Sequence, residues 1–475
     1  MFNKSNDASP NRYFCTNGYG MEQFVVDEVT RKLAAHDIER LQGKVLFSSS
    51  AHINLVKELK SAERLFLLMK RDSPLQLSAP ANPARVASVL KSTLIGDLQQ
   101  WTSAEMTWRR LQGVVADKEN ESEAEEQRTM EEEVFEEENG SDFQIMKKRR
   151  KMDCGDEYVD TGGDFIAGKH DRGKTAPGAN RHSSVPFSFR ISCKCSGSVS
   201  RHLSVQEVSK VLGTSLSGQL GWKVDLRNPQ IEITVYLRDD YCLLGIPLTR
   251  LPLANRCYIK TTGLRSTVAW AMAELAQIQS GSLVLDPMCG MGTILIEAAQ
   301  EHKLAGFLGL DIDDRQLDKA SENVAFAELG DRIHLLKAST TNIPIPNASV
   351  DAVVCDLPFG RKFGTKTDMA ASLPLILAEM ERVLRVGGSL VLLLSPQLSC
   401  LLKKLLTQPQ TRTEDSANKQ GAQEITSTPT QGEEPPMGLM TEPRPPLSSL
   451  EHQATLRLSL GTIDGLLHKY IKTQN

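Results

Sequence analysis

The sequence predicts an α/β protein whose C-terminal half is a Rossmann-like, mainly parallel sheet. Residues 253–475 alternate short apolar runs with helical segments; the runs are LVLDP, FLGLD, IHLLK, AVVCD and SLVLLLS. Parallel strands that are buried on both faces have this composition. Two runs end in an acid followed by a turn, LDPMCGMGT at 285–293 and CDLPF at 355–359. Open α/β sheets bind ligands at the carboxyl ends of their strands, so both turns are candidate sites.

Two smaller units precede this sheet. Residues 11–110 predict an α+β, ferredoxin-like domain, with a strand at YFCTNG, a helix at MEQFVVDEVTRKLAAH and a strand at KVLFSS. Residues 184–252 predict the order strand, helix, strand, strand, at FSFRISCKC, VQEVSKVLGTSLSGQLG, QIEITVYLRD and CLLGIPLT. Each unit can bury one face of a sheet against its helices, as α+β domains do.

Two inserts interrupt these units. Residues 117–142 hold 13 acids and two bases, and KKRRK follows at 147–151. The whole chain has a net charge of -4 and this tract alone carries -11, so the remainder carries +7, which suits a polyanionic partner. An acidic tract cannot form a core, so 111–183 is expected to be disordered. Residues 407–450, rich in Pro, Thr, Ser, Gln and Glu, predict a disordered loop inside the C-terminal domain.

The segments after this loop complete the sheet. ATLRLSL and IDGLLHKY lie at 454–460 and 463–470 and can form an antiparallel pair at the sheet edge. With the five apolar runs, this pair gives seven strands.

The glycine turn favours one class of cofactor. Its strand places Asp286 at the sheet edge, and Gly290 and Gly292 let the backbone pass close beneath a ligand. Thr293 opens a helix whose free amide groups favour an anion. A dinucleotide turn usually reads GxGxxG, whereas here Leu295 replaces the third glycine and an acid precedes the turn. Both differences favour S-adenosylmethionine over NAD, because its amino group needs a carboxylate and its own carboxylate suits the helix start.

The next two strands supply further cofactor candidates. Asp311 follows Asp286 by 25 residues, about the distance at which a βαβ unit delivers an acid to a pair of ribose hydroxyls. Ser339, at the end of LLKAS, is placed where an adenine amine would lie. Asp313 and Asp314 are expected to begin and cap a helix instead.

The DLPF turn carries the expected chemistry. An exocyclic purine amine is a poor nucleophile, because its lone pair is delocalised into the ring. The Asp356 carboxylate, with a backbone carbonyl freed by the rigid turn at Pro358, can accept from both N–H groups, and Phe359 offers a face on which a flipped base stacks. The result would be positioning for in-line transfer of a methyl group. The amine proton would pass either to Asp356 or to water.

The segments LDPMCGMGT, CDLPFGRKF, GWKVDLRNPQIEI and LKSAERLFLL closely resemble the THUMP-domain-containing RNA guanosine N2-methyltransferases. The resemblance implies a seven-stranded class I methyltransferase domain at 253–475, a THUMP domain at 184–252 and formation of N2-methylguanosine in structured RNA. It also implies a heterodimer with a small zinc-containing activator subunit. The branch that the chain resembles most points to U6 small nuclear RNA and pre-mRNA splicing, and the wider family to transfer RNA.

The same resemblance assigns residues and marks two departures. It gives cofactor roles to Asp286, Gly290, Gly292 and Asp311, and base-binding roles to Asp356 and Phe359. The family usually has proline where this chain has Leu357, and an acid where it has Ser339.

Cations near these segments are candidates for phosphate contacts, which fix the register of a folded RNA without reading its sequence. Those of the THUMP unit are Arg190, Lys194, Lys223 and Arg227. Those of the catalytic domain are Lys260, Arg265, Arg361 and Lys362. A solvated surface charge is the alternative for each of them.

Composition also bears on the location of the protein and on whether it contains disulfides or a metal. No apolar stretch reaches membrane-spanning length and the N-terminus lacks a signal-peptide apolar region, so an intracellular protein is expected. Nine cysteines without a CxxC pair argue against disulfides and a bound metal. Cys289 and Cys355 are expected to be packing residues and not nucleophiles. KKRRK is a candidate nuclear-import signal, with charge balance as the alternative.

Three functions of different class remain open. The chain is an RNA guanosine N2-methyltransferase, an inactive RNA-binding scaffold with a methyltransferase fold, or an amine methyltransferase for protein glutamine or adenine. The RNA-directed unit at 184–252 favours the first.

Overall fold

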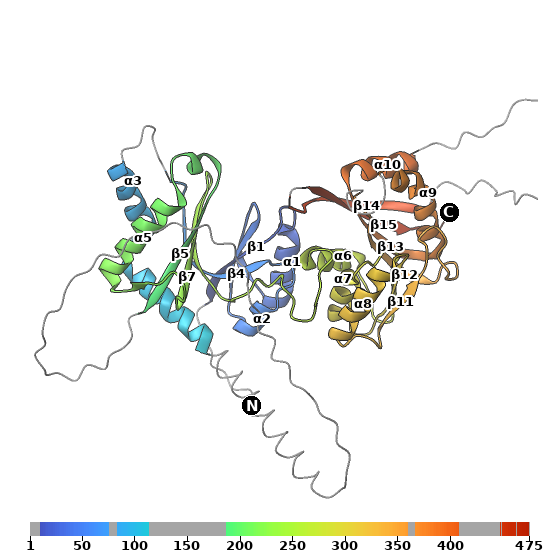
Figure 1. The fold of residues 1–475 in the computed structure, drawn as a ribbon, viewed down its shortest axis with the longest axis horizontal. Helices are drawn as coiled ribbons and strands as arrows, with labels where there is room; N and C mark the ends of the chain where they lie inside the picture. Colours follow the sequence, from blue (N-terminus) through green and yellow to red (C-terminus); the bar gives the residue numbers. More distant parts are fainter. Residues whose placement is uncertain are drawn as a thin grey trace, which may run out of the picture.

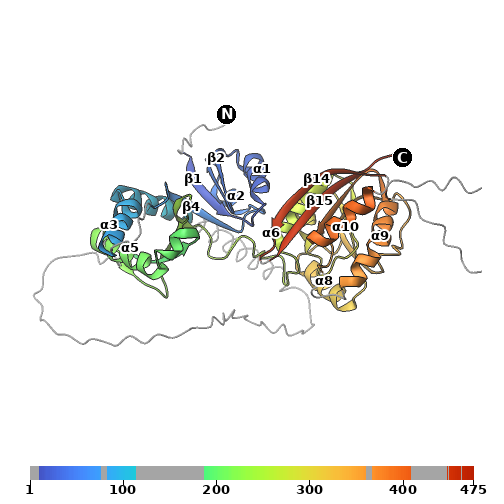
Figure 2. The ribbon, with the colours of Figure 1, turned by 90° about the horizontal axis from the view of Figure 1, so that it is seen from above.

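The computed structural model describes residues 10–75, 83–113, 187–359, 366–407, 447, 449–461 and 463–474. Two sheets organise these residues, one of eight strands and one of seven. The N-terminal strands lie between the second α+β unit and the C-terminal sheet in both views (Figures 1 and 2). No described helix is long and apolar enough to span a bilayer.

The first half of the eight-stranded sheet comes from the N-terminal residues. Its elements are β1 (Asn11–Thr16), α1 (Glu22–Leu33), β2 (His36–Leu41), β3 (Lys44–Ser49), α2 (Ile53–Lys57) and β4 (Arg64–Asp72). β1 pairs antiparallel with both β3 and β4, so its Tyr13, Phe14 and Cys15 are fully buried. The apolar pattern did not indicate β2, because this edge strand pairs with β3 alone and none of its residues is buried.

The second half comes from residues 83–247. Its elements are α3 (Pro83–Leu90), a π-helical turn η1 (Lys91–Ile95), a helix over 98–113, β5 (Ser188–Cys195), the 3-10 helix η3 (Gly197–Arg201), α5 (Val205–Leu220), β6 (Lys223–Val224), β7 (Ile231–Leu237) and β8 (Cys242–Pro247). β5, α5, β7 and β8 follow the expected order of strand, helix, strand, strand, and the structure adds η3 and the two-residue strand β6. A capping box begins α5, in which the Ser204 side chain accepts from the Glu207 amide and the Glu207 side chain accepts from the Ser204 amide.

The two halves share one sheet and one helix. β4 pairs antiparallel with β8, which gives the strand order β2-β3-β1-β4-β8-β7-β5-β6. The helix over 98–113 packs Trp101 into the core beneath β5 and β7, and Leu111 into the core beneath β1 and β3. The N-terminal residues and the unit after them are therefore one continuous layer.

The C-terminal residues form the predicted seven-stranded sheet. Its strands are β9 (Leu283–Asp286), β10 (Gly306–Asp311), β11 (Ile333–Lys337), β12 (Val350–Asp356), β13 (Leu384–Leu394), β14 (Leu450–Ser459) and β15 (Asp464–Lys472), in the order β11-β10-β9-β12-β13-β15-β14. β9 to β13 pair in parallel, whereas β15 pairs antiparallel with β13 and β14. The fold class predicted from the sequence is confirmed, including the antiparallel pair.

Helices cover both faces of this sheet. They are α6 (Ser266–Ala276), α7 (Thr293–Glu301), α8 (Asp314–Phe326), α9 (Lys366–Val383) and α10 (Pro396–Thr407). α6 packs against α7 and contacts β12, β13 and β15. Two cores result, one containing Trp270 of α6 and the other Leu377 of α9. Because β9, β10 and β12 run in parallel, their last residues, Asp286, Asp311 and Asp356, reach the same edge.

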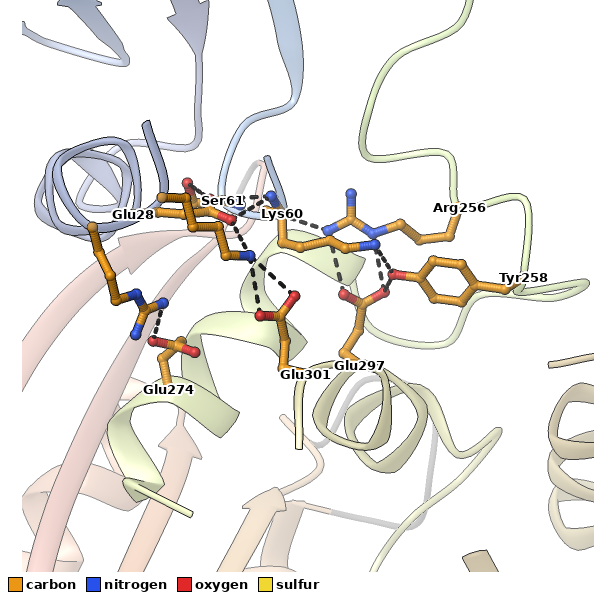
Figure 3. Close-up of polar contacts among 10 residues, drawn as sticks. Glu28, Lys60, Ser61, Arg256, Tyr258, Glu274, Glu297 and Glu301 are labelled. Atoms are coloured by element: carbon orange, nitrogen blue, oxygen red, sulfur yellow. Dashed lines mark hydrogen bonds and ion pairs between the residues drawn. The ribbon is translucent and has the colours of Figure 1, made fainter. Parts of the chain in front are cut away.

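A polar network joins α1 of the N-terminal residues to α7 of the C-terminal, seven-stranded domain (Figure 3). The buried Glu28 carboxylate accepts from the Lys60 and Ser61 amides, the Ser61 hydroxyl and Lys32. Lys32 also pairs with Glu301 at 3.0 Å.

The same interface contains a buried ion pair. Arg256 and Glu297 lie 3.0 Å apart, with side chains only 3% and 0% exposed. Arg256 also donates to the Lys60 carbonyl, while Tyr258 donates to Glu297 and accepts from the Lys60 ammonium group (Figure 3). The network therefore joins residues 256–258 both to Lys60 of the N-terminal residues and to Glu297 of α7.

The hairpin of β14 and β15 makes a second connection. The Ser459 amide donates to the Tyr19 carbonyl at 2.9 Å, and Gly20 packs directly against Arg457. The tip of this hairpin reaches toward the N-terminal strands (Figure 1).

Candidate active site

The glycine turn follows β9 and lies against β10. Gly290 and Gly292 have φ values of +52° and +77°, which favour glycine, and Gly292 directly precedes the first residue of α7. The Cys289 amide donates to the Leu310 carbonyl at 2.8 Å, so the turn is fixed to the neighbouring strand. The free amide groups at the start of α7 therefore open at the carboxyl edge of the sheet.

Asp286 is a buried acid that lacks a partner for one oxygen. Its Oδ1 accepts from the Met288 amide at 3.2 Å, whereas Oδ2 has no hydrogen-bond partner among the described residues. Burial raises the pKa of Asp286 well above its usual value, and the charges of Asp356 and Asp311 raise it further. A buried acceptor of this kind needs a donor, and a cationic amino group fits it.

Asp311 holds the glycine turn in place. Its Oδ2 accepts from the Gly290 amide at 3.0 Å, and its Oδ1 accepts from the Asp313 amide at 2.9 Å. A carboxylate has about four lone-pair sites, so two acceptor positions remain for hydroxyl donors. Asp313 caps α8 as expected, because its side chain accepts from the Arg315 amide.

Asp356 ends β12 at the start of the DLPF turn. Burial raises its pKa from 3.8 to about 7. Leu357 donates its amide to the Leu393 carbonyl at 3.1 Å, and its side chain is fully buried. Proline has no amide hydrogen, so the leucine found here in place of the family's usual proline adds a bond between β12 and β13.

A cavity of about 300 Å³ opens beside the DLPF turn. Pro358 and Phe359 form one side of it, and Phe359 also packs against the core that contains Trp270. Residues from three other elements complete the lining; they are Met369, Ala370, Ser395, Pro396, Gln397, Leu398, Leu401, Ile463 and Asp464. The mixture of an aromatic ring and polar groups suits a planar base.

Two candidates from the sequence have local partners. Ser339 follows β11 and its hydroxyl lies 2.9 Å from that of Thr341. Thr293 is buried, and its hydroxyl accepts from the Gly263 amide at 3.3 Å. The Thr293 side chain therefore positions the segment before α6, while its backbone belongs to the helix start.

Asn323 of α8 is a positioning residue that the sequence analysis missed. Its fully buried amide group accepts from the Thr261 amide and donates to the carbonyls of Thr261 and Met291. It thus holds the glycine turn and the segment before α6 at a fixed separation. An asparagine on an amphipathic helix gives no such signal, because its partners lie 32 and 62 residues away.

The cysteines near the site remain thiols. Burial raises the pKa of Cys289 and Cys355, and the neighbouring carboxylates raise it further. Neither is therefore suited to act as a thiolate nucleophile. No group of His, Cys, Asp or Glu side chains in the described residues could hold a metal ion.

The cations proposed for RNA fall into three groups. Arg190, Lys260 and Arg265 pair with Glu232, Glu322 and Glu63 at 2.6, 2.6 and 2.7 Å. Lys223 and Arg227 are exposed on β6 and the loop after it, and Lys194 lies 5.8 Å from the centre of the Tyr236 ring. Arg361 and Lys362 lie outside the described residues.

Comparisons with known sequences agree with this geometry. Residues 254–424 match the model of the RMKL-like methyltransferase domain, and residues 175–246 match the THUMP domain. The U6 snRNA (guanine-N(2))-methyltransferase THUMPD2 of Bos taurus is 39% identical, over 98% of this chain and 96% of the relative. The Homo sapiens THUMPD2 is 40% identical, over 81% and 78%. The Homo sapiens tRNA (guanine(6)-N(2))-methyltransferase THUMP3 is 26% identical, over 81% of each.

Solved structures show the same fold. TrmN from Thermus thermophilus superposes with a TM-score of 0.59 at 17% identity, over 97% of this chain and 99% of that protein. SMU.472, a putative methyltransferase complexed with SAH, gives 0.58 at 12% identity, over 98% and 99%. The Asp286 oxygen that has no hydrogen-bond partner among the described residues fits the amino group of S-adenosylmethionine, the methyl donor of such enzymes. The acceptor positions left on Asp311 fit its ribose hydroxyls. The chain therefore belongs to the THUMP-domain-containing RNA guanosine N2-methyltransferases.

Proposed function

We propose that this chain methylates the exocyclic N2 of a guanosine in U6 small nuclear RNA and so contributes to pre-mRNA splicing. The observation that carries the proposal is the meeting of Asp286, Asp311 and Asp356 at one sheet edge, where the DLPF turn borders a cavity. Three relatives named as U6 snRNA methyltransferases, 36% to 40% identical to this chain, support the choice of RNA.

The residues around the glycine turn bind and orient the donor. When bound, S-adenosylmethionine supplies the methyl group and keeps the electron pair of the broken S–C bond. Asp286 offers its unpaired Oδ2 to the amino group, and the remaining acceptor sites of Asp311 take the ribose hydroxyls. The free amides at the start of α7, beginning with that of Thr293, receive the carboxylate, while Gly290 and Gly292 let the backbone turn close beneath the cofactor.

The DLPF turn positions the base. Asp356 and a turn carbonyl accept from the two N–H groups of the guanine amine, while Pro358 and Phe359 hold the ring in the adjoining cavity. This arrangement turns the nitrogen lone pair toward the methyl group. As the N–C bond forms, one amine proton passes to Asp356 or to water. A pKa of about 7 matches Asp356 to this exchange near neutral pH.

Nucleoside mass spectrometry tests the substrate. In cells that lack the protein, we expect N2-methylguanosine to disappear from purified U6 RNA and to remain in transfer RNA. The wild-type chain should restore it, and Asp356→Ala should not. Unchanged U6 RNA in the deleted cells would contradict the proposal.

Two alternatives give different results in the same experiment. Loss of the nucleoside from transfer RNA would identify the activity named for the THUMP3 relatives. Rescue of the cells by Asp356→Ala as well as by the wild type would identify an RNA-binding scaffold. The unpartnered Oδ2 of Asp286 favours a cofactor-binding site, because a cationic amino group would give this buried oxygen a hydrogen-bond partner.

We also propose a small zinc-containing activator subunit as the partner in a heterodimer. The catalytic domain leaves Ile312 and Leu336 69% and 42% exposed, next to β10 and on β11. β11 is the edge strand of its sheet, so its outer side has no strand partner among the described residues. Affinity purification from cells should recover the activator with the chain, and co-expression should raise methyl transfer.

The nucleus is the proposed location, since the RNA named for the U6 relatives belongs to splicing. The basic pentad at 147–151 lies outside the described residues and remains the candidate import signal. A fluorescent fusion should be nuclear, and replacing the pentad with glutamines should move it to the cytoplasm.

A further inference from the structure

A second cleft, of about 650 Å³, lies where the N-terminal domain, the THUMP domain and the catalytic domain meet. Asn17, Lys44 and Arg64 reach it from the N-terminal strands, and Lys194 from β5. Arg265 and the hairpin tip at Ser459 close its other side. All three domains therefore contribute to the lining of one cleft.

The lining of this cleft has more positive than negative charge. It contains four cationic side chains and one carboxylate, that of Glu63, which pairs with Arg265. Within the described part of the chain, neither Arg64 nor Lys194 has a carboxylate partner. Lys44 is nine-tenths buried, donates to the Tyr241 hydroxyl and lies 4.2 Å from the centre of the Tyr236 ring.

Among the described residues, no carboxylate forms an ion pair with Lys44. Burial lowers the pKa of Lys44 to about 8, and the positive charges of Arg238 and Lys194 lower it further. The Asp240 carboxylate raises the pKa of Lys44, but its effect is smaller than those of burial, Arg238 and Lys194. Like charges gathered around a buried amine cost free energy, and an anion in the cleft would remove that cost.

A polar group in the cleft also lacks a partner. Asn17 is 6% exposed, its Nδ2 donates to the Gly18 carbonyl, and its Oδ1 has no partner among the described residues. A phosphate supplies no donor for this oxygen, whereas a ribose hydroxyl does. The cleft therefore offers cations for the phosphates and an acceptor for a ribose hydroxyl, the two groups that repeat along an RNA backbone.

The cleft is linked to the active site by the β14–β15 hairpin. Ser459 and Gly461 line the cleft, and Ile463 and Asp464 of the same hairpin line the cavity beside Phe359. We propose that the three-domain cleft binds the RNA backbone, with Lys44, Arg64 and Lys194 on its phosphates, while a base of that RNA enters the neighbouring cavity. This inference rests on the proposed function for its choice of RNA.

Binding of a U6 RNA transcript over a range of salt concentrations tests the cleft. Arg64→Gln and Lys194→Gln each remove one exposed cation from the full-length chain. We expect each to weaken binding by roughly tenfold at low salt and to reduce the slope of log affinity against log salt by about one. At saturating RNA, kcat and S-adenosylmethionine binding should remain those of the wild type, and the change should appear in KM.

Lys303→Gln is the matched control. Lys303 is exposed and precedes β10, so it lies at the amino edge of the sheet, opposite the site. It should keep the wild-type slope. If the double variant Arg64→Gln/Lys194→Gln also keeps that slope, the cleft proposal is wrong even where U6 methylation is found. If the wild type binds U6 RNA without methylating it, the proposal that U6 RNA is the substrate is wrong. The salt dependence of binding by the variants still tests whether the cleft binds the RNA backbone.

Discussion

The catalytic role proposed for Asp356 requires a buried carboxylate, and its burial lowers the stability of the fold. Its pKa in the folded chain, about 7, lies above its usual value of 3.8. Ionising the buried carboxylate therefore costs folding free energy. This cost is absent below about pH 4, grows as the pH rises, and is complete above about pH 7.

We predict that Asp356→Asn makes the chain inactive and more stable. The free energy of unfolding should rise by a few kcal/mol at pH 8 and by clearly less at pH 5, because the wild-type cost is only partly developed there. The kcat should fall at least about 100-fold, because the amide oxygen of asparagine is a weaker hydrogen-bond acceptor than a carboxylate and cannot take up the amine proton. Chemical denaturation at both pH values measures the first effect. Equal stabilisation at pH 5 and pH 8 would show that the carboxylate is not strained by burial.

Asp311 holds the glycine turn, and we propose that it also binds the cofactor ribose. Asp311→Ala removes the acceptor of the Gly290 and Asp313 amides as well as that offered to the ribose. We predict that its Kd for S-adenosylmethionine rises more than about tenfold, because hydrogen bonds to a charged group each contribute about 1.5–3 kcal/mol. Asp314→Ala, which removes the neighbouring exposed acid paired with Lys337, should change the Kd less than about twofold. Calorimetric titration of both variants decides the assignment.

Residues at strand ends were predictable, and those that hold them were not. Asp286, Asp311 and Asp356 each follow an apolar run, so parallel pairing brings them to one edge. The hydroxyl of Thr293 and the amide of Asn323 act through partners 30 to 62 residues away. No periodic pattern encodes such contacts.

At the scale of elements, the β14–β15 hairpin connects the catalytic sheet to the N-terminal domain. The sequence predicted its two strands and their antiparallel pairing, because both are apolar runs separated by a turn. Its docking on residues 17–20 depends on Gly20, whose φ is +88°. A Cβ at this position would lie 2.0 Å from the Arg457 carbonyl oxygen. That contact is visible only when both segments are placed.

We predict that Gly20→Ala separates the hairpin from the N-terminal domain. Gly281→Ala is its control, since Gly281 has a similar φ of +80° but open space around the added carbon. Both variants should lose about 1 kcal/mol from backbone strain, and Gly20→Ala about 1–3 kcal/mol more from the steric clash. Gly20→Ala should also raise KM for RNA, because the hairpin tip lines both cavities. Equal melting temperatures for the two variants would rule out this docking.

At the scale of the whole molecule, the position of the seven-stranded sheet relative to the eight-stranded sheet is set by buried polar groups. The sequence predicted each sheet from its own apolar pattern. It could not predict how the sheets join, because Glu28, Lys60 and Arg256 look like ordinary surface charges until their partners are known. The joining contacts span up to 269 residues, as between Lys32 and Glu301.

The Arg256–Glu297 pair is a buried ion pair between the segment that precedes α6 and the helix α7. Burial raises the pKa of Glu297 even though Arg256 opposes the rise, so desolvation exceeds the attraction within the pair. Arg256→Met leaves a buried carboxylate without its cation and should cost about 3–5 kcal/mol, whereas Arg256→Met/Glu297→Met should cost less than Arg256→Met alone. Thermal denaturation of Arg256→Met, Glu297→Met and the double variant gives the three stabilities that a double-mutant cycle compares with the wild type. We expect Arg256→Met to retain S-adenosylmethionine binding and to lose RNA methylation, because the glycine turn stays intact while the domains separate. Additive costs would instead mean that the two side chains act independently and that other contacts fix the domains.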